Sequence, residues 1–579
     1  MYRLIKGSDM SSSDKPVRTA KNNTTDHTKY INSKKRNVRS EGRPQVQRTK
    51  KRASSVDKLA YIDKINSLAG FLLFILQLVL SIVFIILLSV LNVLPGIYII
   101  LAAVLMLIIL AGVWLLRLPG KQNRYKRKNE KYKLKLRIRR VISLVISLIM
   151  CFVLTVGSYY IHLTDKALNT VTGDGYEITV YKVAVLDEDP AEKITDTQGY
   201  LFGILSDDDQ ISDAIELIED EAKFDIKTSE YSAMDKLLDG LYDGKVGGII
   251  YKSSYGGMFE DIREDYGKDV RIICEVKIKT SVENDPDGQI DDTAQTAEIE
   301  PFILLLSGND EYDEVSVVGR SDVNMLAVVN FEKRQLILIS IPRDYYVQFP
   351  GVTGESRDKL THAGIYGMDT LCDSIGQLFD TNVDYYCRVN FTSVIDIINA
   401  IGGVEFYNPD EFYSETFEHL FPEGTYWYDG YWALQYMRER YAFKDGDITR
   451  GKHQQIILEA MINQIVSAES LTNYTSLISA IEKCAVTNMP ESEIKSIVKQ
   501  QLAEGGEWNI MKTQAKGDGE DMFQPSYAMD GLYVSVVMPY KESVDSISSL
   551  IKKCLNGEEI TEEDLAEPTS YTYITDIIE

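Results

Sequence analysis

Five arginines between residues 320 and 455 stand at the edges of apolar runs, where a purely solvent-facing charge is not expected. They are Arg320, Arg343, Arg438, Arg440 and Arg450. Three aspartates lie close to them in the sequence: Asp310, Asp322 and Asp447. A guanidinium group binds a phosphate through two parallel hydrogen bonds, and carboxylates bind the divalent cations that accompany phosphates. This combination predicts a site for a phosphorylated ligand.

The elements that must position these residues begin near residue 300, where apolar runs and amphipathic segments alternate. A continuous apolar strand at 301–308 ends in a turn, and strand, turn and strand follow over 322–341. Helices are predicted by periodicity and glycine stops near residue 361 and over 369–379, 391–403, 430–437 and 453–468, with strands at 385–390 and 404–408. We expect a three-layer α/β/α sandwich around a twisted central sheet. The predicted sandwich is completed by helices that continue to about residue 504, followed by one strand and one helix.

The charge of the chain is divided sharply. Residues 1–163 carry 29 Lys and Arg against 7 Asp and Glu, a net charge of +22, whereas the remaining residues carry −46. Residues 65–116 contain no charged side chain, which is enough for two membrane spans, near 67–91 and 94–116. A third apolar run covers 141–161. The basic residues flanking these runs place the N-terminus on the cytoplasmic side and the acidic remainder outside.

A smaller α/β unit is predicted between the membrane spans and the arginine-rich region. Strand and helix patterns alternate over residues 164–280, which predicts βαβ units and a mostly parallel sheet. The phrase LLDGLYDGKVGGIIY resembles one lobe of a solute-binding protein, but a spacer or assembly module is the favoured interpretation. The acidic residues that follow resemble a calcium loop but place Ala294 where a bidentate glutamate is required, so we interpret them as a linker.

The full division of the chain follows from these observations. We expect a basic tail at 1–64, three spans within 65–163 with a basic cytoplasmic loop at 117–140, an accessory α/β domain at 164–280, a linker at 281–299, a catalytic domain at 300–560 and an acidic tail at 561–579.

Other chemistries find little support in the composition. The basic tail is explained by topology and anionic lipid, so no nucleic-acid partner is predicted. The six cysteines show neither a disulfide framework nor a zinc pattern, and a Cys484–Cys554 bridge stays an open alternative. With five histidines and no HExxH, a zinc hydrolase is not indicated.

The region from about Glu300 to Gly557 resembles the LytR-CpsA-Psr family, the cell-envelope glycopolymer phosphotransferases of mainly Gram-positive bacteria. The resemblance is carried by phrases preserved in order and spacing: Gly308–Asp310, Arg320–Asp322, Pro342–Asp344, Lys359–Ala363, Arg438–Arg440 and Asp447–Gln455. Any single phrase is weak evidence, and the ordered set is strong. It implies a plasma-membrane enzyme that moves a glycopolymer from a polyprenyl pyrophosphate carrier to peptidoglycan outside the cell.

The resemblance also assigns roles to residues. It implies that the five arginines and Gln454 bind the pyrophosphate, that Asp310 and Asp322 hold Mg²⁺ or Mn²⁺, and that Asp447 orients Arg450 or accepts the acceptor's proton. Arg320, Asp322, Arg343, Asp447 and Arg450 are the expected catalytic set. For the lipid chain, Leu371, Leu378, Phe391, Val394, Ile395 and Ile398 are candidates, although each also fits ordinary core packing.

Two features leave the assignment open. His453 stands where the family usually has a second arginine, so one phosphate contact is lost or made pH-dependent. Arg438 and Arg440, two residues apart, share a face only in an extended segment.

Two other functions are alternatives to the transferase: a non-catalytic regulator that binds polyprenyl phosphate, and a hydrolase that uses water as the acceptor. The polymer, whether teichoic acid or capsular polysaccharide, is not specified.

Overall fold

The computed structural model describes residues 47–119, 130–172, 176–281, 299–309, 318–465, 476, 478–481, 486–520 and 522–574. The chain divides between Ser67 and Leu68 into two units. The described part of the first unit is the N-terminal portion of one helix, α1 (Gln47–Leu91). The remainder of the chain forms the second unit.

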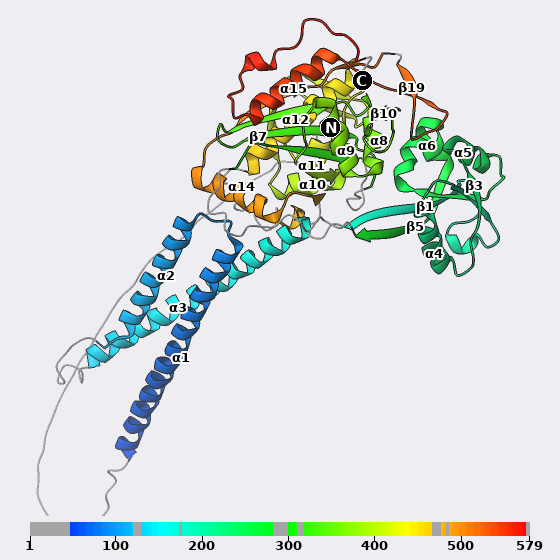
Figure 1. Ribbon diagram of the computed structural model, residues 1–579. Helices are drawn as coiled ribbons and strands as arrows, with labels where there is room; N and C mark the ends of the chain where they lie inside the picture. Colours follow the sequence, from blue (N-terminus) through cyan, green and yellow to red (C-terminus); the bar gives the residue numbers. More distant parts are fainter. Residues whose placement is uncertain are drawn as a thin grey trace, which may run out of the picture. The chain divides into compact units, whose positions relative to one another are not determined.

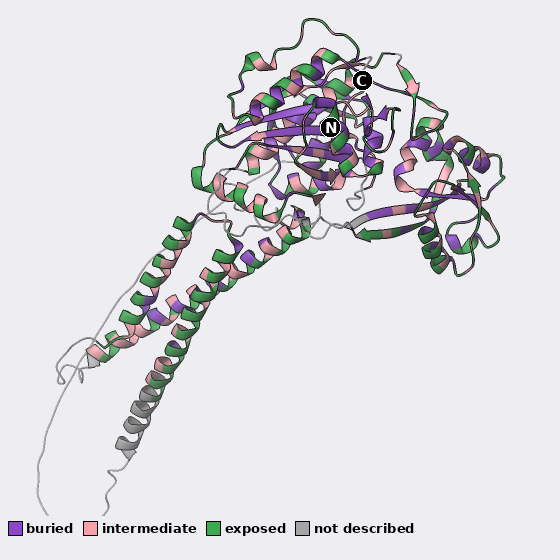
Figure 2. Cartoon of the chain, viewed as in Figure 1, coloured by how far each residue is buried: buried purple, intermediate pink, exposed green. Residues whose placement is uncertain are grey.

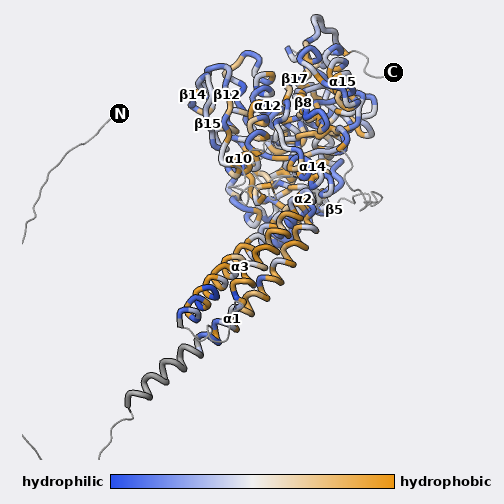
Figure 3. Tube along the Cα trace, turned by 90° about the vertical axis from the view of Figure 1, so that its left-hand side faces the viewer, coloured by the Kyte–Doolittle hydropathy of each residue, from blue (hydrophilic) through white to orange (hydrophobic). Residues whose placement is uncertain are grey.

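Three helices are long and apolar enough to cross a membrane: α1, α2 (Gly96–Arg117) and α3 (Glu130–Thr172). The candidate spans are Asp63–Leu91, Gly96–Arg117 and Lys131–Thr170. Figure 3 shows long hydrophobic stretches along these helices, and Figure 2 shows most of their described residues as exposed or half-buried. Apolar side chains that the protein itself does not cover are suited to contact lipid. The protein is therefore anchored in a membrane.

The accessory domain contains a five-stranded sheet in the order β3-β2-β4-β1-β5. Figure 1 labels its strands β1, β3 and β5. The strands are β1 (Tyr176–Leu186), β2 (Leu201–Leu205), β3 (Lys227–Tyr231), β4 (Gly248–Lys252) and β5 (Val270–Ser281). The expected βαβ units are present: β2 pairs in parallel with both β3 and β4. Strand β1 pairs antiparallel with β4 and β5, so it alone runs opposite to the other four strands of this sheet, which the sequence patterns did not predict.

Helices α4 (Ile211–Ala222), α5 (Met234–Tyr242), α6 (Gly256–Ile262) and α7 (Tyr266–Asp269) complete this domain. Helix α4 packs in an apolar cluster with β1, β2 and β5. Helices α5 and α6 belong to a second cluster, which also includes residues of the larger domain. The accessory domain thus has two apolar faces, and one of them is shared.

The larger domain is built on a six-stranded sheet in the order β16-β11-β6-β7-β8-β17. Its members are β6 (Phe302–Asn309), β7 (Val323–Asn330), β8 (Gln335–Ile341), β11 (Tyr385–Asn390), β16 (Val486–Thr487) and β17 (Asn509–Gln514). The β11–β6 and β17–β8 pairs are parallel, and the other pairs are antiparallel.

Helices cover both faces of this sheet. Ile337 and Ile339 of β8 point into a cluster with α9 (Met368–Phe379) and α15 (Lys541–Leu555). Leu336 and Leu338 point the other way, against α12 (Gly446–Ile465). This alternation follows from the two-residue period of a strand, and every residue of β8 is buried because both faces are covered. The architecture is the predicted α/β/α sandwich.

A third apolar cluster lies beyond α12. It joins α10 (Phe391–Ala400) and α11 (Gly430–Arg438) to the hairpins β12/β15 (Val404–Asn408, Gly424–Tyr428) and β13/β14 (Phe412–Ser414, His419–Phe421). Aromatic rings dominate it: Phe412 and Phe421 stack at a centroid distance of 5.0 Å, and both contact Tyr436. This cluster stabilises the segment that carries Arg438 and Arg440.

Several predicted boundaries differ from the structure. The segment 486–487, expected to be helical, forms the edge strand β16, and helix α14 covers Glu491–Glu504. Strand β17 was not anticipated. The acidic C-terminal segment is packed as far as Ile574, which is buried in the cluster with α9 and α15. Cys554 is buried and unbridged, and Cys484 lies outside the described residues.

Candidate active site

The segment Arg320–Asp322 enters the site immediately before β7. The amide of Asp322 donates to the Gly308 carbonyl at 2.8 Å, and the amide of Ser321 donates to the Thr361 carbonyl at 3.0 Å. The buried hydroxyl of Ser321 also contacts the hydroxyl of Ser307 at 2.7 Å. These bonds hold the backbone of the segment on both sides, so the directions of the Arg320 and Asp322 side chains are set by the sheet.

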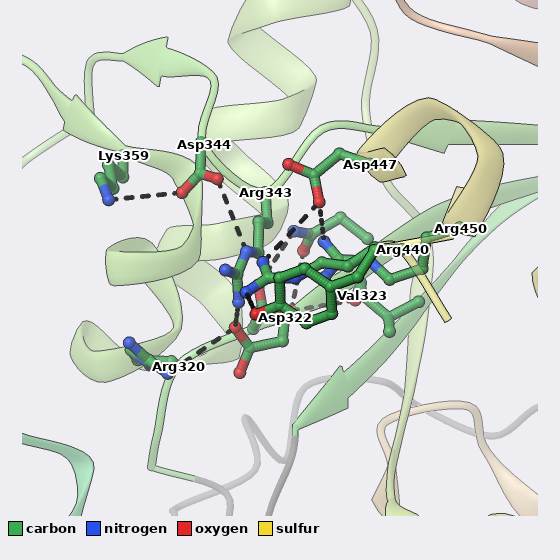
Figure 4. A network of polar contacts seen from close by, with 12 residues as sticks. Arg320, Asp322, Val323, Arg343, Asp344, Lys359, Arg440, Asp447 and Arg450 are labelled. Carbon is green, nitrogen blue, oxygen red and sulfur yellow. Dashed lines mark hydrogen bonds and ion pairs between the residues drawn. The ribbon is translucent and has the colours of Figure 1, made fainter. Parts of the chain in front are cut away.

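Arg343 follows the end of β8 and lies at the centre of the polar network in Figure 4. Its Nη1 donates to Asp322 Oδ1 at 2.5 Å, and its Nε lies 3.5 Å from Asp344 Oδ2. The other oxygen of Asp344 is 3.5 Å from Lys359 Nζ. Arg320 Nη2 is 3.9 Å from Asp322 Oδ1. Asp322 is thus paired with two guanidinium groups: Arg320 precedes the start of β7, and Arg343 follows the end of β8.

The first turns of α12 bring a second acidic group to the network. Asp447 Oδ1 lies 3.1 Å from Arg450 Nη2 and 4.0 Å from Arg440 Nη1. The helix begins at Gly446, earlier than the predicted residue 453, so Asp447 and Arg450 are three residues apart on one helical face. Gln454, one turn further along, is buried beside them.

Arg438 and Arg440 both face the site because α11 ends between them. Arg438 is the last residue of the helix, and Glu439 has extended backbone angles, φ −64° and ψ 127°. The buried Glu439 carboxylate accepts from the amides of Tyr441 and Ala442 at 2.7 and 3.1 Å, which fixes this turn. The Arg438 guanidinium lies 4.4 Å from the ring centroid of Phe391, within cation–π range.

Two adjoining cavities meet at this network. The smaller, about 330 Å³, is lined by all five predicted arginines, together with Asp322 and Gln454. The larger, about 540 Å³, is lined by Asp344, Lys444, Asp445, Asp447 and Lys516, among others. Asp322, Arg343, Arg450 and Gln454 line both cavities and form the wall between them. The structure therefore brings the separated arginine and aspartate phrases together in one place.

The electrostatics of the network favour anions. Burial raises the pKa of Asp322, but the adjacent Arg320 and Arg343 outweigh burial and hold the pKa below its ordinary value. Burial lowers the pKa of Arg450, and the nearby cations Arg343 and Arg440 lower it further, although Asp447 opposes them. The cavity that the five arginines line also includes four carboxylates, those of Glu260, Asp261, Asp322 and Glu439. These carboxylates neutralise part of the guanidinium charge, and the remaining positive charge favours an anionic ligand.

Lys359, Thr361 and His362 support the site from beneath. The amide of Thr361 donates to the carbonyl of Arg343 at 2.8 Å, while Thr361 also accepts from Ser321. His362 is fully buried, and its Nδ1 lies 3.0 Å from Asp358 Oδ1. The backbone of Thr361 therefore holds the segments that carry Asp322 and Arg343, and the side chain of Lys359 contacts the network through Asp344.

Sequence reasoning missed Arg388, the largest fully buried side chain of the chain's described residues. It lies in β11 and donates through Nη2 to the carbonyls of Gly319 and Arg320, at 2.8 and 3.3 Å. Arg388 thereby holds the loop that carries Arg320. An arginine within the apolar phrase YYCRVN was the only available signal.

The structure also alters the expectation for His453. His453 lines neither cavity: it is buried between Tyr436 and Phe412, and its Nδ1 lies 3.0 Å from the Tyr436 carbonyl. Burial lowers the pKa of His453 to about 4, so the imidazole is neutral near pH 7 and makes no pH-dependent phosphate contact there. Asp310, the other predicted metal ligand, lies outside the described residues.

The lipid candidates fall into two groups. Leu371 and Leu378 are buried in the cluster with α9 and α15, on the opposite face of the sheet from α12. The other four, Phe391, Val394, Ile395 and Ile398, belong to the cluster around α10, and Phe391 lines the arginine-rich cavity. A single groove formed by all six residues is therefore excluded.

Comparisons with known proteins identify relatives of this chain. The model of the LytR_cpsA_psr family matches residues 272–540. A polyisoprenyl-teichoic acid–peptidoglycan teichoic acid transferase, TagU, from Enterococcus faecalis is 31% identical over 222 residues, which cover 38% of this chain and 71% of the relative. TagU from Bacillus mycoides is 30% identical, with coverages of 44% and 80%. The crystal structure of B. subtilis TagV is 24% identical, covers 45% of this chain and 99% of that chain, and has a TM-score of 0.38. The chain belongs to the LytR_cpsA_psr family.

Proposed function

We propose that this protein is a membrane-anchored phosphotransferase that moves an anionic glycopolymer from a polyprenyl pyrophosphate carrier to peptidoglycan. The observation that carries the proposal is the cavity lined by five guanidinium groups, whose paired N–H donors suit the oxygens of a pyrophosphate. The TagU relatives, named as transferases of teichoic acid from a polyisoprenyl carrier to peptidoglycan, support this substrate class. The three apolar helices keep the enzyme at the membrane that contains the carrier.

The reaction exchanges one phosphate bond for another. A hydroxyl oxygen of the peptidoglycan sugar attacks the phosphorus that bears the polymer, and the bridging oxygen leaves with the polyprenyl phosphate. The hydroxyl proton passes to a base, and the product is a phosphodiester. Negative charge increases on the leaving phosphate in the transition state, where preorganised cations are most effective.

The two cavities suggest where each substrate binds. The pyrophosphate occupies the arginine-rich cavity, where Phe391, Phe417 and Met437 provide apolar surface beside the phosphate site for the start of the prenyl chain. The acceptor approaches through the larger cavity, which Asp447 lines. Asp447 is half exposed and can receive a proton there, while its contact with Arg450 orients that guanidinium.

A divalent cation fits the chemistry of this site. Asp322 Oδ2 is buried and has no hydrogen-bond partner among the residues that the structure describes. No cluster of three or more potential protein ligands occurs in those residues, so phosphate oxygens would have to complete the coordination. Asp322, with Asp310, would hold Mg²⁺ or Mn²⁺, which would neutralise charge on the pyrophosphate.

The accessory domain and the larger domain lie on the outer side of the plasma membrane of a Gram-positive-type cell.

The experiment uses the full-length protein in detergent with a lipid-linked polymer and peptidoglycan fragments. Arg343→Ala is expected to abolish phosphodiester formation while the protein stays folded. Arg334, at the opposite end of β8, provides the control: it pairs with Glu504 at the surface, and Arg334→Gln is expected to retain transfer. Undiminished transfer by Arg343→Ala, or release of free polymer without attachment to peptidoglycan, would contradict the proposal.

A further inference from the structure

An apolar cluster joins the accessory domain to the larger domain. From the accessory domain it includes Met234, Leu237, Leu238, Leu241, Val246, Ile249, Tyr251, Met258, Phe259 and Tyr266. From the larger domain it includes Tyr346, Met529, Val534 and Val536. All of these side chains are buried. A shared core of this kind makes the contact between α6 and the larger domain part of the folded structure.

Helix α6 uses this contact to reach the arginine-rich cavity. Three of its residues, Gly257, Glu260 and Asp261, line the cavity together with the five arginines. A Cβ atom added to Gly257 would lie 2.3 Å from both Cζ and Nη1 of Arg320, and 2.5 Å from Nη2. The backbone of Gly257 therefore touches the whole guanidinium group, and no larger residue fits while Arg320 keeps its position.

Arg320 is consequently held between two domains. Asp322 attracts its guanidinium from within the larger domain at 3.9 Å, and Gly257 limits it from the accessory domain. Only 17% of the Arg320 side chain is exposed. Arg388 donates a hydrogen bond to the backbone carbonyl of Arg320. Asp322 and Gly257 thus contact the guanidinium from two domains, while Arg388 holds the backbone of the same residue.

We infer that the accessory domain completes the pyrophosphate site, with Gly257 acting as a positioning residue for Arg320. The inference rests on the proposed function for the identity of the ligand. A side chain at position 257 would push the flexible end of Arg320 away from the cavity rather than disturb the core. The consequence is a weaker hold on the pyrophosphate and on the charge that develops on it, with little change in stability.

The preceding residue, Gly256, provides a matched control. Gly256 and Gly257 are the first two residues of α6, and a Cβ added to Gly256 meets nothing within 4 Å. Neither glycine has a positive φ, so alanine is tolerated by the backbone at both positions. Any general effect of alanine in the helix is shared by the two variants, and only Gly257→Ala disturbs Arg320.

The test measures transfer kinetics, thermal unfolding and binding of inorganic pyrophosphate with the full-length protein. Gly257→Ala is expected to lower kcat/KM and pyrophosphate affinity about tenfold or more without lowering Tm, whereas Gly256→Ala matches the wild type. In an Arg320→Ala background, Gly257→Ala is expected to have no further effect, because its action passes through Arg320. Equal behaviour of the two glycine variants, or full additivity with Arg320→Ala, overturns the inference.

The pyrophosphate probe separates this inference from the proposed function. If the wild type binds pyrophosphate and Gly257→Ala weakens binding, the inference holds even where no polymer transfer is found. If polymer is transferred and Gly257→Ala neither slows transfer nor weakens binding, the proposed function holds and the inference fails.

Discussion

Replacing Arg388 with methionine is the most informative perturbation of the scaffold beneath the site. Arg388 is fully buried, and its Nη2 donates to the carbonyls of Gly319 and Arg320. Methionine has a similar length but no donor, so both carbonyls lose their charged partner. The expected result is a protein that folds with lower stability and that no longer holds Arg320 and Asp322 in register.

The magnitude follows from the two lost bonds. Hydrogen bonds from a charged donor contribute about 1.5–3 kcal/mol each. Part of this is offset because methionine is easier to bury than a guanidinium group. A net loss of about 3 kcal/mol in unfolding free energy is expected, which lowers Tm by roughly 6–12 °C for a domain of this size. A shift of about 1 Å at the reacting groups lowers kcat about 100-fold.

The assay compares Tm and single-turnover transfer, the latter well below the Tm of every variant. Cys387→Ala is the control, because Cys387 is the neighbouring residue of β11 and points to the opposite face of the sheet. It is expected to lose some stability but to keep its turnover. Wild-type turnover by Arg388→Met, at a temperature where it is folded, would refute a positioning role for Arg388.

Three further predictions concern charge. Asp322→Asn is expected to reduce transfer at least 100-fold, because Arg320 and Arg343 lose their shared counter-charge; near-normal transfer would contradict the network drawn here. Chelation by EDTA is expected to stop transfer and added Mg²⁺ to restore it; transfer that persists through exhaustive chelation would exclude the metal. His453 has a folded-state pKa of about 4, below its unfolded value of about 6.5, so its neutral burial contributes up to about 3 kcal/mol above pH 6.5 that is lost as the pH falls towards 4. Tm measured over this range should therefore fall less steeply in His453→Phe than in the wild type, and parallel curves would refute the burial argument.

The strands of the larger domain were predictable where apolar residues dominate them. Strands β6, β7 and β8 have continuous apolar runs because both faces of the sheet are covered by helices. Strand β17, with the sequence NIMKTQ, escaped prediction because it lies at the sheet edge and is mostly exposed or half-buried. Its strand conformation comes from pairing with β8, which is more than 170 residues away in the sequence.

The candidate site was predictable to the extent that its residues form ordered phrases. The gathering of Arg320, Arg343 and Arg450 around Asp322 agrees with the prediction that these phrases meet. The orientation of Arg438 and Arg440 was not accessible, because it depends on α11 ending at Arg438 and on the Glu439 carboxylate that fixes the following turn. The two-residue spacing alone does not show this, because the chain changes from helix at Arg438 to extended backbone at Glu439.

The contact between α6 and Arg320 shows why the role of the accessory domain could not be obtained from sequence patterns. Periodicity predicts what a helix buries, and in α6 the buried residues are Met258 and Phe259. The residue that meets the site, Gly257, has no side chain, so it contributes nothing to an apolar or charged pattern. Its function is to be small at one place, and that requirement exists only because two domains share a core. Position 257 needs a small residue because the guanidinium of Arg320 lies against it. The two residues are neighbours only in the folded structure, so the sequence alone does not reveal this requirement.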